Sequence, residues 1–575
     1  VQDGHVVQLD LEFNQLMGTL PSSIGNLVHL TFLNLSTNAL TGSIPNEIQN
    51  LVALQTFDLS NNELTGNLPE GLGNLSQLQF LFLGNNGFNG SIPTEIGNLS
   101  NLTNLSLDQN NLDGIIPSEL GNLGNLNYLY LNNNNLIGPI PNEFENILNL
   151  KHLYLGNNSL NGTIPIALGN LSNLTYLSLI YNMLSGTIPK ELGNITNLNL
   201  LDLSFNVFSG EIPKELGNLS SVKFIYLQFN ELSGIIPPEL GNPTNLSYLL
   251  IGNNNLSGNI PVDLKNLSNL KYLGLYGNNL NGMIPIELGN LTNLTYLGLH
   301  NNNLSGIIPP ELGNLPNLTN LSLYSNQFTG TIPPELGNLL NLETLYLNDN
   351  NLVGTIPPEL GNLSNLKYLL IQNNVLNGPI PIELGNITSL LDFRLDNNNL
   401  DGDIPSAIID QTSVAFLQVK NNQFDFGNLE YTYQNADDIN FGYIPQQKTD
   451  QPESLEVVEG SDIVLTTGIS GTQNHYQWYK DGQPIIGALD FPNYPIIGAT
   501  LEDAGTYHCV MTSDIITDLV LTRHNIDLVV TENTQADEDG NMITVWDYDL
   551  NTNLKANTRR YYDDLGKPVQ TQSLD

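Results

Sequence analysis

A period of 24 residues constrains the fold of this chain more than any other feature. An Asn occurs every 24 residues from Asn14 through Asn110 to Asn422, which makes eighteen occurrences without an insertion or deletion. A Gly lies four residues after each of the first seventeen, and a Pro lies seven residues after each of the same seventeen. One copy is too short to bury its own apolar side chains, so the copies must stack into a solenoid.

Each residue type in one copy has a physical role. Leu105 and Leu107 alternate with polar residues, which predicts a short strand that buries one face, with the next copy about 4.8 Å away in parallel. Where the strand ends, the backbone loses its partners, and a buried carboxamide can supply them. We therefore predict a structural role for Asn110 and for its counterparts Asn134 and Asn158.

The repeat LxGxIPxxLGNLxNLxxLxLxxNxL, over about residues 6–424, resembles the plant-specific class of leucine-rich repeats. This class occurs in plant receptor-kinase ectodomains, polygalacturonase-inhibiting proteins and secreted bacterial proteins. The resemblance implies an α/β solenoid, a horseshoe or superhelix of eighteen 24-residue repeats with a parallel sheet on the concave side. Paired Cys residues are missing at both ends and no membrane helix follows the array, which favours the bacterial version.

Composition excludes several functions. The formal net charge of −41 argues against nucleic-acid binding, which needs a basic surface. Much of this charge forms a row of Glu residues two positions after the repeat Pro, which we interpret as a solvated face in preference to a calcium site. A single Cys forbids an intrachain disulfide, and no apolar run is long enough to span a membrane. We expect no cofactor or metal, and an extracellular or cell-surface location with Val1 as a processed N-terminus.

Aromatic residues gather at the displayed strand positions, six, four and two residues before each recurring Asn. Tyr offers rigid area and a hydroxyl, so we predict that these residues bind a protein or a neutral glycan. The alternative is that they fill the repeat and stack on their counterparts in the next copy. The predicted ligand-binding residues are Tyr128, Tyr130, His152, Tyr154, Tyr176, Phe224, Tyr226, Tyr248, Tyr272, Tyr276, Tyr296 and His300, together with Tyr181, which flanks the same face.

After the array, residues 454–531 have short alternating strands punctuated by Gly and Pro, which is typical of an all-β sandwich. The stretch resembles an immunoglobulin-like domain: Trp478 matches the core Trp of strand C, and the run from Asp503 through Tyr507 to Cys509 matches strand F. Thr467 stands where the partner Cys is expected. We therefore predict structural roles for Trp478, Tyr507 and Cys509 in a core without a disulfide.

The last segment, 532–575, is predicted to be an acidic linker followed by TRRYYDDLGKP, which resembles the start of an RHS/YD-type repeat region of large secreted bacterial proteins. If so, further C-terminal domains of the same polypeptide would follow. The remaining predicted boundaries are a leucine-rich-repeat solenoid with a closing segment at 1–436 and a linker at 437–453.

We hypothesise an extracellular recognition or adhesion module that binds its partner on the concave face. One alternative is the N-terminal targeting arm of a larger RHS-type toxin or shell protein. Another is an enzyme inhibitor of the polygalacturonase-inhibiting kind. We expect no catalytic residues, because no nucleophile–base pair, carboxylate pair or metal-ligand spacing occurs in the sequence.

Overall fold

A computed structural model describes residues 4–411, 413–533, 542–548, 554–562 and 568–574, the last three segments for their backbone only. The chain divides into two compact units. The first unit comprises Val1–Leu400, Pro405–Val419 and Ala436–Gly442. The second comprises Asp401–Ile404, Lys420–Asn435 and Tyr443–Asp575.

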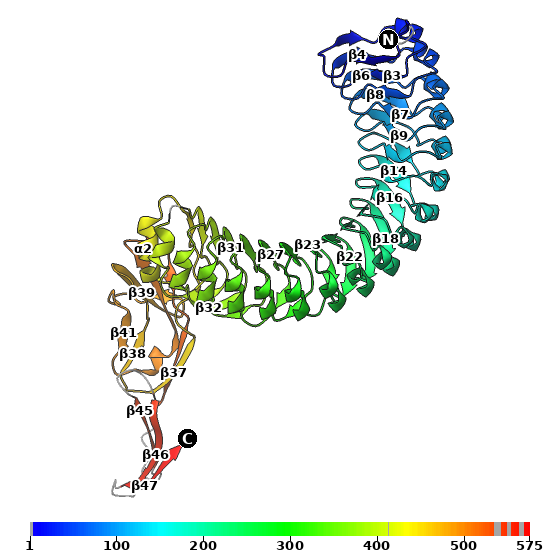
Figure 1. Cartoon of the computed structure of the whole chain (residues 1–575). Coiled ribbons are helices and arrows are strands. Elements are labelled where there is room, and N and C mark those ends of the chain that lie inside the picture. Colours follow the sequence, from blue (N-terminus) through cyan, green and yellow to red (C-terminus); the bar gives the residue numbers. More distant parts are fainter. Residues whose placement is uncertain (1–3, 412, 534–541, 549–553, 563–567, 575) are drawn as a thin grey trace. The chain divides into compact units, whose positions relative to one another are not determined.

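The first unit is a solenoid built on a parallel sheet of nineteen strands (Figure 1). Residues paired across neighbouring strands differ by 24 in number, as for Tyr128 and His152. The strands are β1 (Gln8–Asp10), β3 (Phe32–Asn34), β5 (Thr56–Asp58), β7 (Phe80–Phe82), β9 (Asn104–Ser106), β11 (Tyr128–Tyr130), β13 (His152–Tyr154), β15 (Tyr176–Ser178), β17 (Leu200–Asp202), β19 (Phe224–Tyr226), β21 (Tyr248–Leu250), β23 (Tyr272–Gly274), β25 (Tyr296–Gly298), β27 (Asn320–Ser322), β29 (Thr344–Tyr346), β31 (Tyr368–Leu370), β33 (Asp392–Arg394), β35 (Phe416–Gln418) and β36 (Asn440–Gly442).

A second set of short parallel strands lies between each sheet strand and the following helical turn. The repeat Gly falls within or next to these strands and adopts a positive φ, +74° at Gly114, which suits a residue without a side chain. These strands are β2 (Met17–Thr19), β4 (Ala39–Gly42), β6 (Glu63–Asn67), β8 (Gly87–Ser91), β10 (Asn111–Asp113), β12 (Ile137–Gly138), β14 (Ser159–Gly162), β16 (Met183–Gly186), β18 (Val207–Glu211), β20 (Glu231–Ile235), β22 (Asn255–Gly258), β24 (Asn279–Leu280), β26 (Ser305–Gly306), β28 (Gln327–Phe328), β30 (Val353–Gly354), β32 (Val375–Pro379) and β34 (Asn399–Asp401).

Short 3-10 helices follow the repeat Pro on the side of the solenoid away from the sheet (Figure 1). Pro sits at the N-cap with an extended backbone, so it ends the strand and starts the helix without losing a needed donor. The helices are η1 (Ser22–Asn26), η2 (Asn46–Asn50), η3 (Glu70–Asn74), η4 (Thr94–Asn98), η5 (Ser118–Asn122), η6 (Asn142–Asn146), η7 (Ile166–Asn170), η8 (Lys190–Asn194), η9 (Lys214–Asn218), η10 (Pro238–Gly241), η11 (Val262–Asn266), η12 (Ile286–Asn290), η13 (Pro310–Asn314), η14 (Pro334–Asn338), η15 (Pro358–Asn362) and η16 (Ile382–Asn386), with the α-helix α1 (Ser406–Ile409) in the same position.

The recurring Asn residues form a ladder of hydrogen bonds between turns. Asn110 Nδ2 donates to the carbonyl oxygen of Leu83 at 3.0 Å, and Asn110 Oδ1 accepts from the backbone N–H of Phe88 at 3.0 Å. Both partners belong to the preceding turn. Asn134 and Asn158 make the equivalent contacts. Each carboxamide thus satisfies backbone groups that the end of the sheet leaves unpaired.

Leucines fill the interior between the sheet and the helices. Leu105, Leu107, Leu112 and Leu120 are all fully buried. Burying one such side chain contributes roughly 1.5–3 kcal/mol, and the interior is continuous along the stack, so each turn depends on its neighbours.

The sheet extends one strand beyond the sequence repeat. β36 pairs in parallel with β35, and Phe416 is the register partner of Asn440. β36 lies inside 437–453, for which we predicted a linker. The sequence signal is weak here because Gln446 stands 24 residues after Asn422, where a ladder Asn would be expected, and its Oε1 accepts the backbone N–H of Asn422 at 3.2 Å.

The second unit contains the helix α2 (Phe426–Asn435), the 3-10 helix η17 (Leu501–Asp503) and short strands. One six-stranded sheet is mixed, since β37 and β44 pair in parallel while the other pairs are antiparallel. A separate antiparallel pair is formed by β38 and β41. The strands are β37 (Glu453–Val458), β38 (Ile463–Thr466), β39 (Asn474–Lys480), β40 (Gln483–Pro484), β41 (Asn493–Ile496), β42 (Gly505–Ser513), β43 (Leu521–Thr522) and β44 (Ile526–Thr531).

Three further antiparallel strands fall in the predicted segment 532–575: β45 (Met542–Tyr548), β46 (Leu554–Tyr562) and β47 (Pro568–Leu574). The acidic run at 534–541 and the Asp-Asp-Leu-Gly-Lys run at 563–567 lie outside the described residues. The region after β36 is therefore built mainly of strands, in one mixed sheet and two antiparallel ones. The predicted domain boundaries stay predictions.

The ladder predicts the effect of one substitution. Asn302→Ala removes the acceptor of the Leu280 N–H and the donor to three carbonyl oxygens, at 3.0–3.3 Å. We expect the free energy of unfolding to fall by about 1–3 kcal/mol in urea titrations, because buried backbone groups lose their partners. The neighbouring exposed Asn303→Ala is the control, and an equal loss in both variants would contradict the ladder.

Close packing of the helical side predicts a second effect. A Cβ on Gly121 would lie 2.5 Å from the carbonyl oxygen of Glu143 in the next turn, whereas a Cβ on Gly124 would meet nothing within 4 Å. Gly121→Ala should therefore lower Tm by several degrees, because backbone must move. Gly124→Ala should leave Tm unchanged or slightly raised, and equal Tm values for the two variants would refute close stacking.

Candidate ligand-binding surface on the strand face

The candidate site is the strand face, the side of the nineteen-stranded sheet that displays the residues six, four and two positions before each ladder Asn. Side chains there are held by the sheet register, which places equivalent residues of successive turns side by side. Tyr128 and Tyr130 lie on β11, His152 and Tyr154 on β13, Tyr176 on β15, Phe224 and Tyr226 on β19, Tyr248 on β21, Tyr272 on β23 and Tyr296 on β25, whereas Tyr276 and His300 follow β23 and β25. We call these residues the aromatic stripe; all of them are half-buried.

The stripe falls into two clusters, and the first lies on β11, β13 and β15. The His152 ring meets Tyr128 edge-on at 4.7 Å between centroids and Tyr176 at 4.5 Å. Tyr130 stacks on Tyr154 at 5.3 Å, and the Tyr130 hydroxyl is hydrogen-bonded to His152 Nδ1 at 3.0 Å. Four side chains around one imidazole make this cluster a connected, ordered surface.

The two clusters are separated by β17, which displays Leu200 and Asp202 in place of aromatic rings. Asp202 is buried, and its Oδ1 accepts the Ser204 hydroxyl at 2.6 Å. Burial raises the pKa of the Asp202 carboxyl, against the lowering effect of that hydrogen bond. The stripe is therefore interrupted at β17.

The second cluster begins with Phe224 and continues as a stack of tyrosines on β21, β23 and β25. Tyr248 and Tyr272 are 4.5 Å apart at 10°, and Tyr272 and Tyr296 are 5.8 Å apart at 17°. Tyr296 leans along its own strand, so a Cβ on Gly298 would lie 2.6 Å from the Tyr296 hydroxyl. Gly298 thus leaves the space that the ring occupies.

A parallel stack follows the strand ends. His300 lies between Tyr276, at 4.8 Å and 1°, and Tyr324, at 4.4 Å and 15°. A Cβ on Gly252 would approach Tyr276 Cε2 to 2.7 Å, so a glycine again makes room for a ring. The result is a slab of two aromatic stacks that rests on glycines and has little freedom to rearrange.

Burial sets the protonation of this surface. It raises the pKa of Tyr226 and of Tyr296 to about 12, and it lowers the pKa of His300 to about 4. The pKa of His152 is also lowered, by burial first and then by Lys151. At neutral pH these aromatic side chains are uncharged, which suits an uncharged or apolar ligand group.

Tyr181 does not join the strand-face clusters. It lies immediately before a ladder Asn, at φ +52°, and stacks on Phe205 at 4.1 Å, which in turn stacks on Phe229 at 4.3 Å. Phe205 was missed from the sequence, although its place one residue before Asn206 is the same as that of Tyr181. Tyr324 and Tyr346, which are 6.3 Å apart, also belong to the aromatic surface and were not among the predicted site residues.

In the second unit, Trp478 and Cys509 are fully buried register partners on β39 and β42. The Tyr507 hydroxyl donates to the carbonyl oxygen of Asp503 at 2.7 Å. Burial raises the pKa of the Cys509 thiol to about 12, so the sulfur stays protonated and is a poor nucleophile. Thr467 Oγ1 donates to Asp450 Oδ2 at 2.8 Å.

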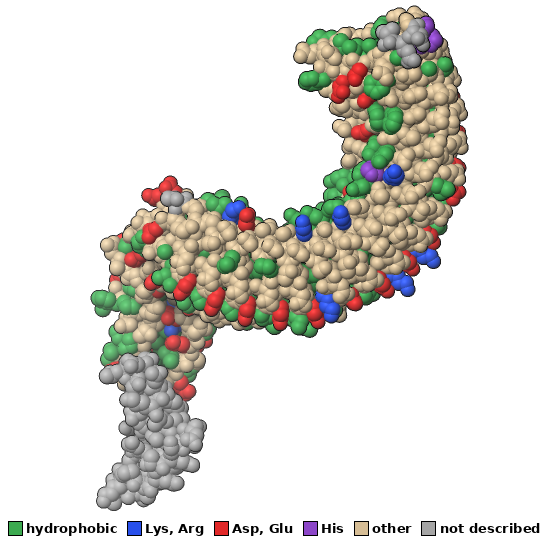
Figure 2. All heavy atoms as spheres, viewed as in Figure 1, with side chains coloured by type: hydrophobic (Ala, Val, Ile, Leu, Met, Phe, Trp, Pro, Cys, Tyr) green, Lys and Arg blue, Asp and Glu red, His purple; other side chains and the backbone are tan. Residues whose placement is uncertain are grey.

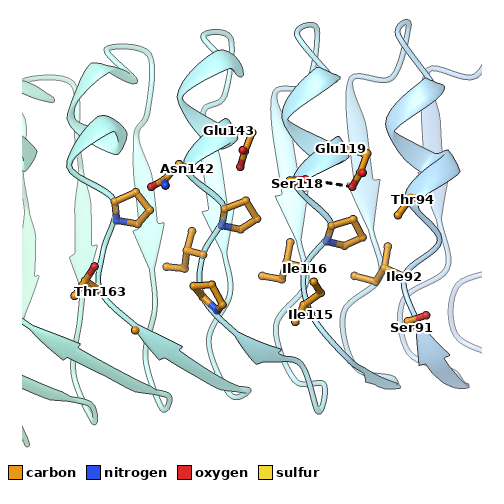
Figure 3. Close-up of a pocket in the computed structure, with 16 residues that line it drawn as sticks. Ser91, Ile92, Thr94, Ile115, Ile116, Ser118, Glu119, Asn142, Glu143 and Thr163 are labelled. Carbon is orange, nitrogen blue, oxygen red and sulfur yellow. Dashed lines mark hydrogen bonds between the residues drawn. The ribbon is translucent and has the colours of Figure 1, made fainter.

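A shallow depression on the opposite side of the solenoid lies between the second strands and the 3-10 helices (Figure 3). Ile92, Ile116 and the repeat prolines line it, and Ser118 Oγ donates to Glu119 Oε2 at 3.4 Å. The same positions line another depression further along, with Ile164 and Ile188. It is therefore a feature of the repeat itself. Acidic side chains lie in the first turn of these helices, such as Glu119 in η5 and Glu287 in η12, and Figure 2 shows acidic side chains in a row along the solenoid.

Among the residues that the structure describes, no three His, Cys, Asp or Glu side chains are grouped so as to hold a metal ion. Within the same part of the chain, no helix has the length and apolar character that a membrane crossing requires. What the strand face offers chemically is contact area, ring edges and neutral hydroxyl groups.

Comparisons with known proteins agree with this geometry. The chain belongs to the leucine-rich-repeat family. No curated protein matches it in sequence. The matching family descriptions are "Leucine-rich repeat region" at 5–113, "Leucine rich repeat" at 100–160, "Leucine Rich Repeat" at 173–195, 197–219, 221–243, 245–267, 269–291 and 293–315, and "Leucine Rich repeats (2 copies)" at 316–362.

Several solved plant structures are similar. The ectodomain of the Arabidopsis thaliana receptor kinase GASSHO1/SCHENGEN3, in complex with CASPARIAN STRIP INTEGRITY FACTOR 2, is 36% identical over 78% of this chain, with a TM-score of 0.66. This chain spans 59% of that receptor chain. The plant peptide hormone receptor RGFR1 with RGF2 is 32% identical over 79% of this chain and 83% of its own, with a TM-score of 0.65. Arabidopsis HAESA with the peptide hormone IDA and the co-receptor SERK1 is 30% identical over 78% and 80%, also at 0.65.

The lowered pKa of His300 predicts a pH dependence of stability. Between pH 6.5 and about 4 the unfolded chain takes up a proton at this imidazole and the folded chain does not, so His300 reduces stability as the pH falls. Compared with His300→Phe, the wild type should lose more unfolding free energy between pH 7 and pH 5 in urea titrations. A His300 imidazole that titrates near 6.5 by NMR would contradict the burial of this ring.

Proposed function

We propose that the chain is an extracellular recognition or adhesion module that binds a protein or a neutral glycan on the strand face. The observation that most directly supports this is the aromatic slab of the second cluster, from Tyr248 to Tyr324, whose rings stack on one another from turn to turn. We also propose that the chain is not an enzyme and needs no cofactor.

The slab has the energetic properties of a binding surface. Ordering flexible side chains on association costs free energy, and rings already held by stacking avoid much of that cost. Tyrosine adds a large contact area and a hydroxyl that can bond to a partner, and such residues dominate many interfaces. Uncharged rings favour uncharged partner groups, which agrees with a neutral glycan or an apolar peptide side chain.

The similar plant receptors support a protein or peptide as the partner, because three of them were solved in complex with CASPARIAN STRIP INTEGRITY FACTOR 2, RGF2 or the peptide hormone IDA. They also support an extracellular or cell-surface location. Nucleic acid is a poor candidate partner for a chain of net charge −41.

We infer further that the solenoid consists of eighteen repeats of 24 residues, since paired strands keep that offset. The second unit has features that support an immunoglobulin-like domain. Between residues 453 and 531 its strands form one sheet in the order β37-β44-β42-β39-β40, with β43 paired to β42, and one β38–β41 pair. The hydroxyl of Tyr507, two residues before Cys509, bonds back to Asp503. Such a domain would act as a spacer or a second contact.

A second candidate function is a targeting arm of a larger RHS-type secreted protein. The observation in its favour is that β45, β46 and β47, in the segment that carries the Tyr-Tyr-Asp-Asp sequence, form an antiparallel sheet. The DNA sequence downstream of the codon for Asp575 tests this alternative, since many Tyr-Asp repeats would favour it and a stop codon would exclude it. The enzyme-inhibitor alternative has no such observation in its favour.

The strand-face proposal predicts the effect of a triple substitution. Replacing Tyr248, Tyr272 and Tyr296 with Ala should weaken the binding of any ligand found on neutral-glycan arrays or peptide arrays by about tenfold or more, because central aromatic anchors carry most of the binding energy. The Tm measured by thermal denaturation should change by only a few degrees.

The matched control replaces Phe80 and Phe82 with Ala, which removes strand-face rings outside both clusters. Binding should survive this change. If the triple variant keeps the wild-type affinity for every array ligand, the tyrosines only fill the repeat and the proposal is wrong.

A further inference from the structure

Three consecutive turns of the solenoid carry an aromatic residue at a position where, apart from Phe13 in the first turn, the other turns have small or polar residues. This position is the one immediately before each ladder Asn, and its backbone is left-handed throughout, at φ between +51° and +63° from turn to turn. Asn, Asp and Gly suit this conformation, whereas bulky residues are disfavoured in it. The aromatic occupants in consecutive turns are Tyr181, Phe205 and Phe229, at φ +52°, +54° and +58°, and Phe13 in the first turn stands apart from them.

These three rings form one continuous stack, which we call the ridge. Tyr181 and Phe205 are 4.1 Å apart at 18°, and Phe205 and Phe229 are 4.3 Å apart at 15°. Tyr181 is 48% exposed and Phe229 is 42% exposed. Beside them, Met183 and Val207, two residues further along their turns, are 54% and 42% exposed. The ridge is therefore the centre of an exposed apolar patch.

The fold itself does not require aromatic residues here. Asn157 in the turn before the ridge and Asn253 in the turn after it have the same backbone conformation, at φ +53° and +51°. The neighbouring turns therefore adopt the same backbone conformation without an aromatic ring at this position. Backbone strain that the fold does not need is characteristic of functional surfaces.

We propose that the ridge is a docking surface for a folded protein partner whose apolar groove is bordered by basic side chains. This inference does not depend on ligand binding at the strand face. Tyr181, which the sequence grouped with the strand-face residues, belongs to this second surface.

The stacking geometry favours a protein over a sugar as the occupant. Rings about 4 Å apart cover one another's faces, so a pyranose ring cannot stack on Phe205, and mainly the ring edges face outwards. Edges and flanking aliphatic side chains form a narrow apolar projection that fits a groove. Large, rigid apolar side chains of this kind are typical anchors of protein interfaces.

Charge complementarity gives the partner's second property. Glu231 directly follows the ladder Asn of the last ridge turn, in the row of Met183 and Val207, and Glu211 lies at the end of β18 on the neighbouring turn. Both carboxylates are exposed. A chain of net charge −41 also repels anionic bilayers, which disfavours a membrane as the occupant.

The first part of the test measures stability in the full chain. Tyr181→Asn, Phe205→Asn and Phe229→Asn together restore the residue type of the neighbouring turns, and Tm should be unchanged or raised because strain is relieved. The matched reverse change, Asn133→Phe in a turn without an aromatic neighbour in this row, should lower Tm. A clear fall in Tm for the triple variant would overturn the proposal, because the rings would then be structural.

The second part measures binding with a defined probe, a phage-displayed library of small folded domains with randomised groove residues. Binders selected on the wild-type chain should lose about tenfold or more affinity on the triple Asn variant and should carry apolar residues with Lys or Arg. They should still bind the Tyr248, Tyr272 and Tyr296 triple Ala variant, which separates this surface from the strand face. The proposal would be overturned by binders whose affinity is the same for the wild type and the triple Asn variant, or by ridge-dependent binders rich in Asp and Glu. Loss of neutral-glycan binding in the triple Asn variant would also overturn it.

Discussion

The structure of the solenoid depends on satisfying the backbone groups that the ends of its short strands leave buried. Strands of three residues make few ladder bonds, and the chain must then turn through an apolar interior. Asn110 and its counterparts supply two donors and an acceptor at that point, and each bonds to the preceding turn as well as to its own. Loss of one partner leaves polar groups buried and unpaired, which explains why the spacing tolerates no insertion.

Because the interior fixes the Leu, Asn, Gly and Pro positions, variation is confined to the surface. The same register that stacks Leu upon Leu also stacks ring upon ring, so a few substitutions in neighbouring turns create an extended aromatic surface. Gly252 and Gly298 leave space for the rings of Tyr276 and Tyr296, because a Cβ at either position would clash with the ring. The strand face and the ridge are two outcomes of this principle, one in relaxed strand positions and one in a strained turn.

Much of the fold follows from the sequence, since the period, the alternation of leucines and the Asn at each strand end have direct physical meanings. A closing segment was expected after the array, but the position of β36 could not be predicted because the leucine pattern fails there and Gln446 occupies the ladder position. The sequence shows which position of the repeat each candidate residue occupies, but it does not show which of these residues contact one another. The gap at Asp202, the placement of Tyr181 on Phe205 and the burial of His300 depend on rotamers and on neighbours in adjacent turns.

The central claim is that the solenoid presents a preformed aromatic strand face as its binding surface. Hydrogen–deuterium exchange of the full chain, with and without a ligand identified on glycan or peptide arrays, tests this most directly. The account predicts that the ligand slows exchange in peptides from β19 to β25 and leaves the 3-10 helices unchanged. Slower exchange confined to the helical side of the solenoid, or to the second unit, would contradict it.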